Sequence, residues 1–339
     1  MENKHRAIVV GCGRIGAQSE LDERRDKPAT HLGVYRRCKY TELVGLVDTD
    51  KEKLAAAKSQ IDDNIATFND VVTAIDKLRP DIVSVATTSS SHKDVVKAAA
   101  AKKTPLIMCE KPIAETIEDA EEMVAACNES GSILIVNHTR RFDRFLGAWR
   151  KSICEEGIVG EFQQIWGGYA IGLQHMGTHL IDFMMFLLGN VKSVMGVFNH
   201  KAHTAIPGDT CVDGILEFEN DTHGAIQSVN VKNYSLFEIR LLGAKMDVFI
   251  RDMGLTVEHV PAEPSQRFSG FTELNIAHRG SAHRPETGES QFGAFVDHVV
   301  AVLNGTEFPT STGEDALGVL KVLSALKKSA QNEGAKTIV

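Results

Sequence analysis

The chain has 339 residues, which is long for one domain and comfortable for two, and its 43% hydrophobic and 24% charged residues are ordinary for a globular protein. A formal net charge of −8 without a basic stripe argues against a nucleic-acid or anionic-membrane partner. No apolar run approaches the roughly 18 residues that span a bilayer, and no signal peptide is evident. Six cysteines without a C-x-x-C pair predict reduced thiols, so we expect a cytoplasmic protein.

Short apolar runs alternate with helical patterns over the first 137 residues. The apolar runs span residues 5–11, 42–48, 81–87, 104–110 and 132–138. The helical patterns between them span residues 51–60, 69–78, 91–103 and 116–131. Strands that are apolar on both faces and alternate with helices predict a doubly wound parallel sheet, the architecture of an α/β domain.

The pattern changes after residue 137, where we place the start of a second domain, 138–339. Helices are expected at 145–157, 176–189, 290–305 and 312–330. Strands are expected at 193–200, 210–220, 223–231, 237–243 and 246–252, and an irregular stretch at 253–289. Consecutive strands joined by turn residues predict an α+β domain with a mainly antiparallel sheet. Whether the last helix packs back on the first domain stays open.

The motif "GCGRIG" at residues 11–16 follows the first predicted strand directly. Gly11 permits a tight turn, Gly13 lets the backbone approach a pyrophosphate, and Gly16 allows close packing of helix on strand. The helix N-terminus that follows supplies N–H donors and a favourable dipole. The cofactor contacts expected from this turn are Gly11, Gly13, Arg14 and Ile15.

Asp48 ends the second predicted strand, where a carboxylate accepts hydrogen bonds from the adenine ribose hydroxyls. No arginine directly follows it, so a 2′-phosphate would be repelled and we predict NAD rather than NADP. The distance from Gly16 to Asp48 exceeds the usual spacing of about 20 residues. The excess lies in residues 17–37, which either cover the cofactor or substrate or form a plain surface insertion.

Two further strands end in "ATTSSSH" and "CEKP". Ligands of doubly wound sheets bind beyond the carboxyl ends of the strands, so we expect Thr87, Thr88, Glu110 and Lys111 to face the cofactor. A partly desolvated Lys111 beside a pyridinium would have a lowered pKa and could position or deprotonate a hydroxyl. The alternative is a lysine that reaches a surface rim.

The stretch "HMGTHLID" spaces His175, His179 and Asp182 at i, i+4 and i+7, on one face of a helix. A histidine can act as general base toward an alcohol. Two histidines and a carboxylate can also hold zinc, but no second cluster supports this and we expect no metal. The plainest alternative is a hydrogen-bonded histidine at a domain interface.

Six motifs in this order, "GCGRIG", "VDTD", "ATTSSSH", "CEKPIA", "RRFD" and "GTHLID", resemble the glucose-fructose oxidoreductase, inositol dehydrogenase and rhizopine-catabolism (Gfo/Idh/MocA) family. The resemblance covers essentially the whole chain. It implies an N-terminal Rossmann domain and a C-terminal domain with an open, mostly antiparallel sheet. It also implies that His92 belongs to the cofactor site, with Thr88 standing where the family has proline.

The resemblance implies that Lys111 and His179 are catalytic, and it puts His175 where the family has an aspartate. Either the site suits an anionic substrate, with His138, Arg140 and Arg141 assisting, or His175 only hydrogen-bonds the substrate while His179 acts alone. The substrate contacts expected are His138, Arg141 and Asp182.

The function expected is NAD-dependent hydride transfer between nicotinamide and a secondary alcohol or ketone of a sugar, sugar acid or polyol. One alternative is a sugar enzyme of the glycosidase or epimerase type that retains NAD without net redox chemistry. Another is a non-catalytic sensor of NAD or sugar. We expect a homodimer or homotetramer assembled through the exposed face of the second sheet, because an open sheet exposes apolar surface.

Overall fold

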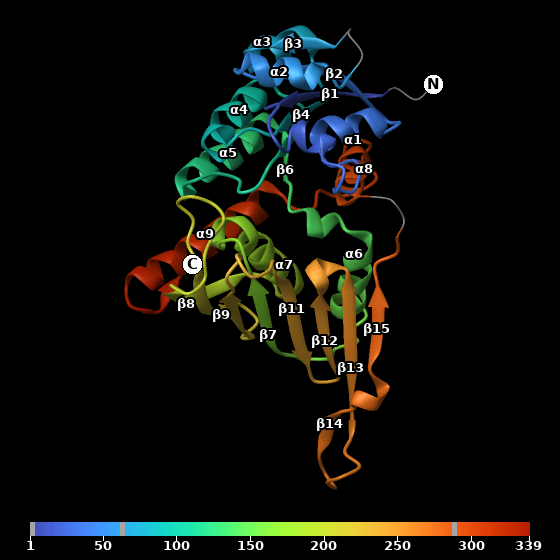
Figure 1. Cartoon of the computed structure of the whole chain (residues 1–339), viewed down its shortest axis with the longest axis vertical. Helices are drawn as coiled ribbons and strands as arrows, with labels where there is room; N and C mark the ends of the chain where they lie inside the picture. Colours follow the sequence, from blue (N-terminus) through green and yellow to red (C-terminus); the bar gives the residue numbers. More distant parts are fainter. Residues whose placement is uncertain (1–3, 62–64, 287–289) are drawn as a thin grey trace. The chain divides into compact units, whose positions relative to one another are not determined.

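The computed structural model describes residues 4–61, 65–286 and 290–339. Its packing divides the chain into two compact units (Figure 1), Met1–Asp143 with Glu286–Leu317, and Arg144–Pro285 with Gly318–Val339. The chain therefore returns to the first unit after it has built most of the second. The division expected from sequence, 1–137 and 138–339, takes no account of this return.

The first unit is built on a six-stranded parallel sheet with the order β3-β2-β1-β4-β5-β6. Its strands are β1 (His5–Val10), β2 (Thr41–Val47), β3 (Ala66–Phe68), β4 (Ile82–Val85), β5 (Leu106–Cys109) and β6 (Ile133–Val136). The doubly wound arrangement is confirmed. Only β3 was not predicted, because three half-buried or exposed residues carry no apolar signal.

Helices cover both faces of this sheet, with α1 against α8 and with α3, α4 and α5 in contact in a row (Figure 1). They are η1 (Gln18–Leu21), α1 (His31–Arg37), α2 (Lys51–Lys58), α3 (Val71–Leu78), α4 (Ser89–Ala101), α5 (Ile117–Ser130), η2 (Thr139–Phe142) and α8 (Gln291–Leu303). Five of the helices start at a side chain that accepts hydrogen bonds from the first turn, which fixes where each begins. These caps are Thr30, Asp50, Asp70, Thr116 and Ser290.

The returning segment completes the first unit. In α8, Phe295 is fully buried and packs on Phe142 at 4.5 Å between ring centroids. Beyond α8, the carbonyl of Ser311 accepts a hydrogen bond from the amide of Val136 at 2.8 Å, beside the last strand of the sheet. The core of this unit therefore depends on residues about 170 positions apart in the chain.

The second unit carries a ten-stranded sheet with the order β14-β13-β12-β11-β7-β10-β9-β8-β16, and β15 pairs with β13. Its strands are β7 (Phe162–Tyr169), β8 (Val191–Phe198), β9 (Val212–Phe218), β10 (His223–Ser228), β11 (Phe237–Gly243), β12 (Met246–Arg251), β13 (Thr256–Pro264), β14 (Thr272–Leu274), β15 (Gly280–His283) and β16 (Thr337–Ile338). Strands β10 and β7 run parallel, while β8, β9, β11, β12 and β13 pair with their neighbours in antiparallel fashion. The mainly antiparallel sheet is confirmed.

The expectation of an irregular stretch at 253–289 is wrong for its described residues, because β13, β14 and β15 lie there. Strand β13 carries Pro261 and Pro264 near its end, and proline is tolerated toward the edge of a sheet. Strand β7 was also missed, because "WGGY" lowers its strand signal. A Cβ at Gly167 would lie 2.8 Å from Leu180, so glycine there lets a helix pack closely on the strand.

The helices of the second unit are α6 (Arg144–Arg150), the π-helical segments η3 (Lys151–Glu155) and η4 (Leu173–Gly177), α7 (Thr178–Leu188), the short η5 (Asp252–Gly254) and η6 (Ile276–His278), and most of α9 (Gly313–Gln331). The core forms between the sheet and α7 with α9, where Leu180, Met184 and Leu326 are fully buried. Within the part of the chain that the structure describes, no helix is long and apolar enough to cross a lipid bilayer.

Candidate functional site

The glycine turn between β1 and η1 is tight at two of its glycines and open at the third. Gly11 has φ +95°, and a Cβ there would meet Ala86 at 2.7 Å. A Cβ at Gly16 would lie 1.9 Å from the carbonyl oxygen of Gly11. A Cβ at Gly13 would meet nothing within 4 Å. The backbone is therefore tightly packed at Gly11 and Gly16. It leaves free space at Gly13, the glycine that was expected to face a pyrophosphate.

Asp48 follows β2 and is bonded to the glycine turn. One carboxylate oxygen accepts a hydrogen bond from the amide of Cys12 at 2.7 Å, and the other accepts from the amide of Asp50 at 2.8 Å. Each oxygen keeps a lone pair for a further donor. An oriented carboxylate beside an open glycine turn fits the ribose and pyrophosphate of NAD, and it would repel a 2′-phosphate. This geometry places the protein in the class of dinucleotide-binding α/β proteins.

The insertion after the glycine turn is a loop tied down by Glu20. The Glu20 carboxylate accepts hydrogen bonds from the amide of Ala29 at 2.8 Å and the hydroxyl of Thr30 at 3.0 Å, and it pairs with Arg37 at 3.4 Å. The α-helix predicted directly after the glycine turn is not formed, because the turn leads into the short 3₁₀ helix η1 and the first α-helix, α1, begins only at His31. The inserted loop is therefore anchored at the start of α1.

The residues after β4 and those after β5 are linked by a histidine. Thr87 and Thr88 follow β4, and Thr88 precedes the first residue of α4. The ring of His92 contacts the carbonyls of Pro112 and Ile113 at 3.1 Å and that of Thr87 at 3.2 Å. Burial lowers the pKa of His92 although these carbonyls oppose the shift. The ring of His92 therefore lies between the two strand ends, where a neutral imidazole can donate a hydrogen bond to only one of them. Its contact with a cofactor stays a prediction.

Glu110 and Lys111 follow β5, as the sequence predicted, and the bond between Lys111 and Pro112 is cis. Glu110 is buried, and its carboxylate accepts hydrogen bonds from the amide group of Asn137 at 2.7 Å and from the ring of His31 at 3.0 Å. His31 was missed because the insertion separates it from the glycine motif. The threonine cap before it was the signal that could have placed it at a helix start.

The charged residues after β6 contact the returning segment of the first unit. His138 is buried and its ring is hydrogen-bonded to the hydroxyl of Ser311 at 3.0 Å. Arg141 pairs with Asp315 at 3.1 Å, and its side chain is only 5% exposed. A guanidinium already paired with a carboxylate attracts a second anion less strongly. A role for these two residues in substrate binding stays a prediction.

The predicted histidine cluster of the second unit lies across two kinds of helix. His175 lies in the π-helical η4, where the α-helical spacing assumed in the prediction does not apply. His179 and Asp182 lie in α7 and are buried. They are three residues apart and share a helix face. No group of three or more His, Cys, Asp or Glu side chains among the described residues is arranged to hold a metal ion.

Asp209, which the sequence did not single out, anchors the start of this helical run. Its carboxylate accepts hydrogen bonds from the amides of Gln174 at 3.0 Å, His175 at 3.2 Å and Thr210 at 2.7 Å. Burial raises the pKa of Asp209, and the three amides partly oppose that rise. The backbone of His175 is therefore held by a carboxylate from the loop before β9.

The six cysteines are all free thiols. Burial, and next the negative charge of Asp48, raise the pKa of Cys12 to about 12. Burial is also the main reason that the pKa of Cys127 rises to about 12. Thiols with such pKa values are protonated at neutral pH and are poor nucleophiles.

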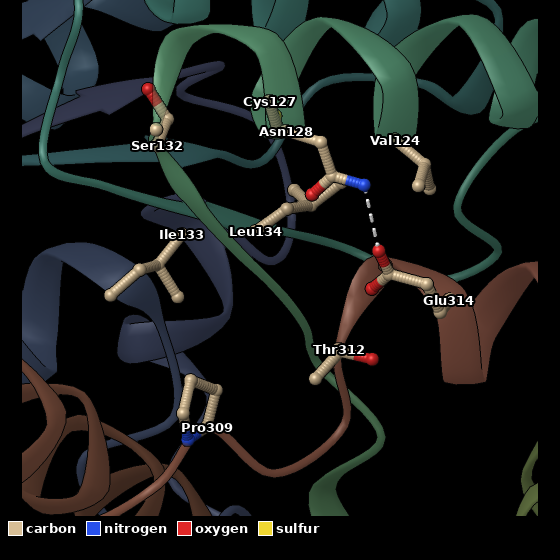
Figure 2. A pocket seen from close by; sticks show the side chains of 11 residues that line it. Val124, Cys127, Asn128, Ser132, Ile133, Leu134, Pro309, Thr312 and Glu314 are labelled. Carbon is tan, nitrogen blue, oxygen red and sulfur yellow. Dashed lines mark hydrogen bonds between the residues drawn. The ribbon is translucent and has the colours of Figure 1, made fainter.

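A cavity of about 280 Å³ opens in the first unit beside β6. Figure 2 shows Asn128 of α5 donating a hydrogen bond to Glu314 of α9 across it, at 3.1 Å. None of the predicted site residues lines this cavity, so we do not assign it to the cofactor or substrate.

Two family models match the chain, one described as an oxidoreductase family with an NAD-binding Rossmann fold over residues 5–138 and one as the GFO/IDH/MocA C-terminal domain over residues 151–248. The 1,5-anhydro-D-fructose reductase of Ensifer adhaerens is 36% identical over 326 residues, which cover 87% of this chain and 91% of that protein. The chain therefore belongs to the Gfo/Idh/MocA family of oxidoreductases, and its cofactor is NAD.

Two more proteins bear on the comparison. The 2,7-anhydro-N-acetylneuraminate hydratase of Escherichia coli K12 is 44% identical over 245 residues, which cover 65% of this chain and 63% of that protein. The crystal structure of the WlbA dehydrogenase from Bordetella pertussis, in complex with NADH and UDP-GlcNAcA, matches with a TM-score of 0.77 at 22% identity over 99% of both chains. At that identity the match confirms the fold.

Proposed function

We propose that this oxidoreductase transfers a hydride between nicotinamide and a secondary alcohol or ketone of a sugar, sugar acid or polyol. The observation that carries the proposal is the position of Lys111. It follows β5, on the sheet edge where the glycine turn follows β1 and Asp48 follows β2. Ligands of doubly wound sheets bind at this edge, so a cofactor held by the turn and Asp48 has a lysine within the same crevice.

Bound NAD supplies the acceptor or donor of the hydride. The amides of Gly13, Arg14 and Ile15 would face its pyrophosphate, since those of Gly11 and Cys12 already donate to Val47 and Asp48. Asp48 would accept hydrogen bonds from the adenine ribose. Lys111 would orient the reacting oxygen of the substrate. His179 would take the hydroxyl proton when the alcohol is oxidised and return it when the ketone is reduced. His175 would hydrogen-bond the substrate.

An anionic substrate, such as a sugar acid or sugar phosphate, is one of the two forms of this proposal that the sequence leaves open. The family resemblance expects an acceptor-only carboxylate where this chain has His175. An imidazole can donate a hydrogen bond and can carry positive charge, so it suits an anion better than a carboxylate does.

The experiment is an absorbance screen at 340 nm with NAD and a panel of sugars, polyols, sugar acids and sugar phosphates. Lys111→Ala should lower turnover of the best substrate by about 10²- to 10⁴-fold, the usual range for a residue that assists proton transfer. Lys97→Ala, which removes an exposed lysine paired with Glu122, is the matched control. Full activity in Lys111→Ala would reject the role given to the lysine.

A second candidate, a sugar enzyme that retains NAD without net redox chemistry, is supported by the likeness to the hydratase. It predicts that purified protein releases NAD on denaturation and changes a substrate without an absorbance change at 340 nm. Product analysis by NMR on the same panel separates the two candidates. Bound NAD with no product from any compound would favour the sensor.

We also propose a homo-oligomer, assembled through the face of the second sheet that points away from its helices. Met195 pairs across the strands with Ile215, and the row continues through Ala225 and Trp166. Met195 and Ile215 are 41% and 46% exposed. An apolar row of this kind marks an interaction surface. Sedimentation as a monomer at micromolar concentration would overturn this part.

The six free cysteines support a reducing compartment such as the cytoplasm.

A further inference from the structure

A buried polar cluster lies directly before Lys111 in the first unit. The ring of His31, which is fully buried, contacts the hydroxyl of Ser84 on β4 at 2.5 Å and the carboxylate of Glu110 at 3.0 Å. Asn137, after β6, donates to the same carboxylate oxygen at 2.7 Å. The cluster therefore joins α1 to the ends or interiors of three neighbouring strands, and the mechanism proposed above makes no use of it.

One arrangement of hydrogens satisfies both ring nitrogens of His31. The hydroxyl of Tyr35 donates to Ser84 at 3.3 Å. Ser84 can then donate to Nδ1 of His31, and Nε2–H of His31 donates to Glu110. Each group in this chain gives its hydrogen toward the carboxylate, which accepts from Asn137 as well. A donor chain that ends on a buried oxygen favours the ionised carboxylate.

The charges around Glu110 agree with an ionised carboxylate. Burial by itself would raise the pKa of Glu110, but hydrogen bonds from His31 and Asn137 and the charge of Lys111 bring the pKa below its ordinary value. Two further titratable groups interact with it, His92 of α4 and Cys109 of β5. Burial lowers the pKa of His92 and raises that of Cys109, so both are neutral near pH 7.

The charge of Lys111 therefore balances that of Glu110, while His31 donates a hydrogen bond to the carboxylate. The attraction is mutual, because a positive Lys111 that favours the ionised carboxylate is itself favoured by it. A buried carboxylate is costly unless it is paired and hydrogen-bonded. The sequence suggested that desolvation lowers the pKa of Lys111. The carboxylate of Glu110, one residue before it, acts to raise that pKa.

We propose that His31, acting through Glu110, is a positioning residue that keeps Lys111 as an ammonium group, so that Lys111 donates a hydrogen bond to the reacting oxygen and does not serve as the base. The proposal rests on the function proposed above, and it leaves the proton transfer to His179. It can be tested separately from that function, because the charge of Lys111 can be measured without turnover.

The test follows the titration of Lys111 by NMR in protein whose lysines carry ¹³C-methyl groups, with the signal assigned by its loss in Lys111→Arg. In the unsubstituted protein, Lys111 should titrate no lower than an ordinary lysine, at about 10.4. The midpoint should fall by about one pH unit or more in Glu110→Gln and in His31→Leu. His31→Gln, which can still donate to Glu110, should recover most of that shift.

Glu115→Gln is the matched control, because Glu115 is an exposed carboxylate of the same turn and bonds to Ser89. It should leave the titration unchanged. A midpoint well below 10 in the unsubstituted protein overturns the proposal even if every variant unfolds. An unshifted midpoint in folded Glu110→Gln overturns it as well. Failure of the absorbance screen leaves this titration readable, so the two proposals can fail separately.

Discussion

The two units hold their candidate site residues in different ways. In the first unit most of them follow the ends of parallel strands, β1, β2, β4, β5 and β6, so separate elements hold them. Glu110 alone is bonded to His31 of α1 and to Asn137 after β6. In the second unit, His175, His179 and Asp182 lie on one continuous helical run. The start of that run is bonded to a single carboxylate, Asp209.

The difference predicts how far the effect of a substitution should spread in each site. A residue held by many elements can be changed with a local effect, because its neighbours keep their own anchors. Residues on one run move together if the anchor of the run is lost. Of the three predictions below, given in order of decreasing effect, the first two test this contrast and the third concerns the stability of the second sheet.

Asp48→Ala should have the largest effect, because it removes a ligand contact and also the acceptor that holds the glycine turn through Cys12. We expect NAD affinity to fall by about 10- to 100-fold, as for the loss of hydrogen bonds to a charged group. The affinity for NADP relative to NAD should rise. Calorimetry with both dinucleotides measures the two quantities.

Asp50→Asn is the control for Asp48, because it removes a nearby negative charge and keeps an acceptor for the amides of α2. It should leave the cofactor preference unchanged. Equal preference ratios in Asp48→Ala and the parent protein would show that Asp48 does not read the ribose.

Asp209→Ala should lower the free energy of unfolding by about 0.5–2 kcal/mol, as loss of a helix cap does. Its effect on turnover should be larger than its effect on stability suggests, because the backbone amides of Gln174 and His175 lose their acceptor while α7 stays packed in the core. Affinity for NAD should not change. Thermal unfolding, steady-state kinetics and calorimetry provide these three readouts.

Asp221→Asn removes the charge of an exposed carboxylate of the same unit that pairs with Lys192, and it serves as control. Asparagine tolerates the φ of 63° at this position. If Asp209→Ala kept full turnover while losing stability, the contrast between the two sites would not hold.

The smallest effect concerns pH at the edge of the second sheet. Hydrogen bonds from Lys336, Ser193 and Lys192 lower the pKa of Glu217 to about 2. A lowered pKa stabilises the folded state above the ordinary value of 4.5, and this contribution is lost as the pH falls toward about 2. The terminal strand β16, which follows Lys336, should therefore exchange its amide hydrogens faster at pH 3 relative to the rest of the sheet.

Amide exchange compared between pH 6 and pH 3 measures this, after correction for the intrinsic exchange rate. Glu217→Gln should remove the pH difference at β16. A difference that persists in this variant would assign it to another group.

The sequence predicted best what depends on strand ends. Asp48, Thr87 and Lys111 each follow an apolar run, and parallel strands bring such positions to one edge of a sheet. His31 and Asp209 were missed because each acts across a long stretch of chain that no local pattern spans. His175 was found, but its π-helical turn was not, because an apolar periodicity cannot distinguish a π turn from an α turn.

The return of the chain to the first unit has a consequence for synthesis on the ribosome. Although the sheet of this unit is made from the first 136 residues, its fully buried Phe295 and Val299 arrive about 160 residues later. Ile135 likewise lacks its partner Thr312, with which it forms an antiparallel β-bridge, until that residue is synthesised. A nascent chain that has completed β6 thus exposes apolar surface while the whole second sheet is made. We expect chaperones to bind this exposed surface. Nonsense mutations before α8 should yield a truncated protein that aggregates.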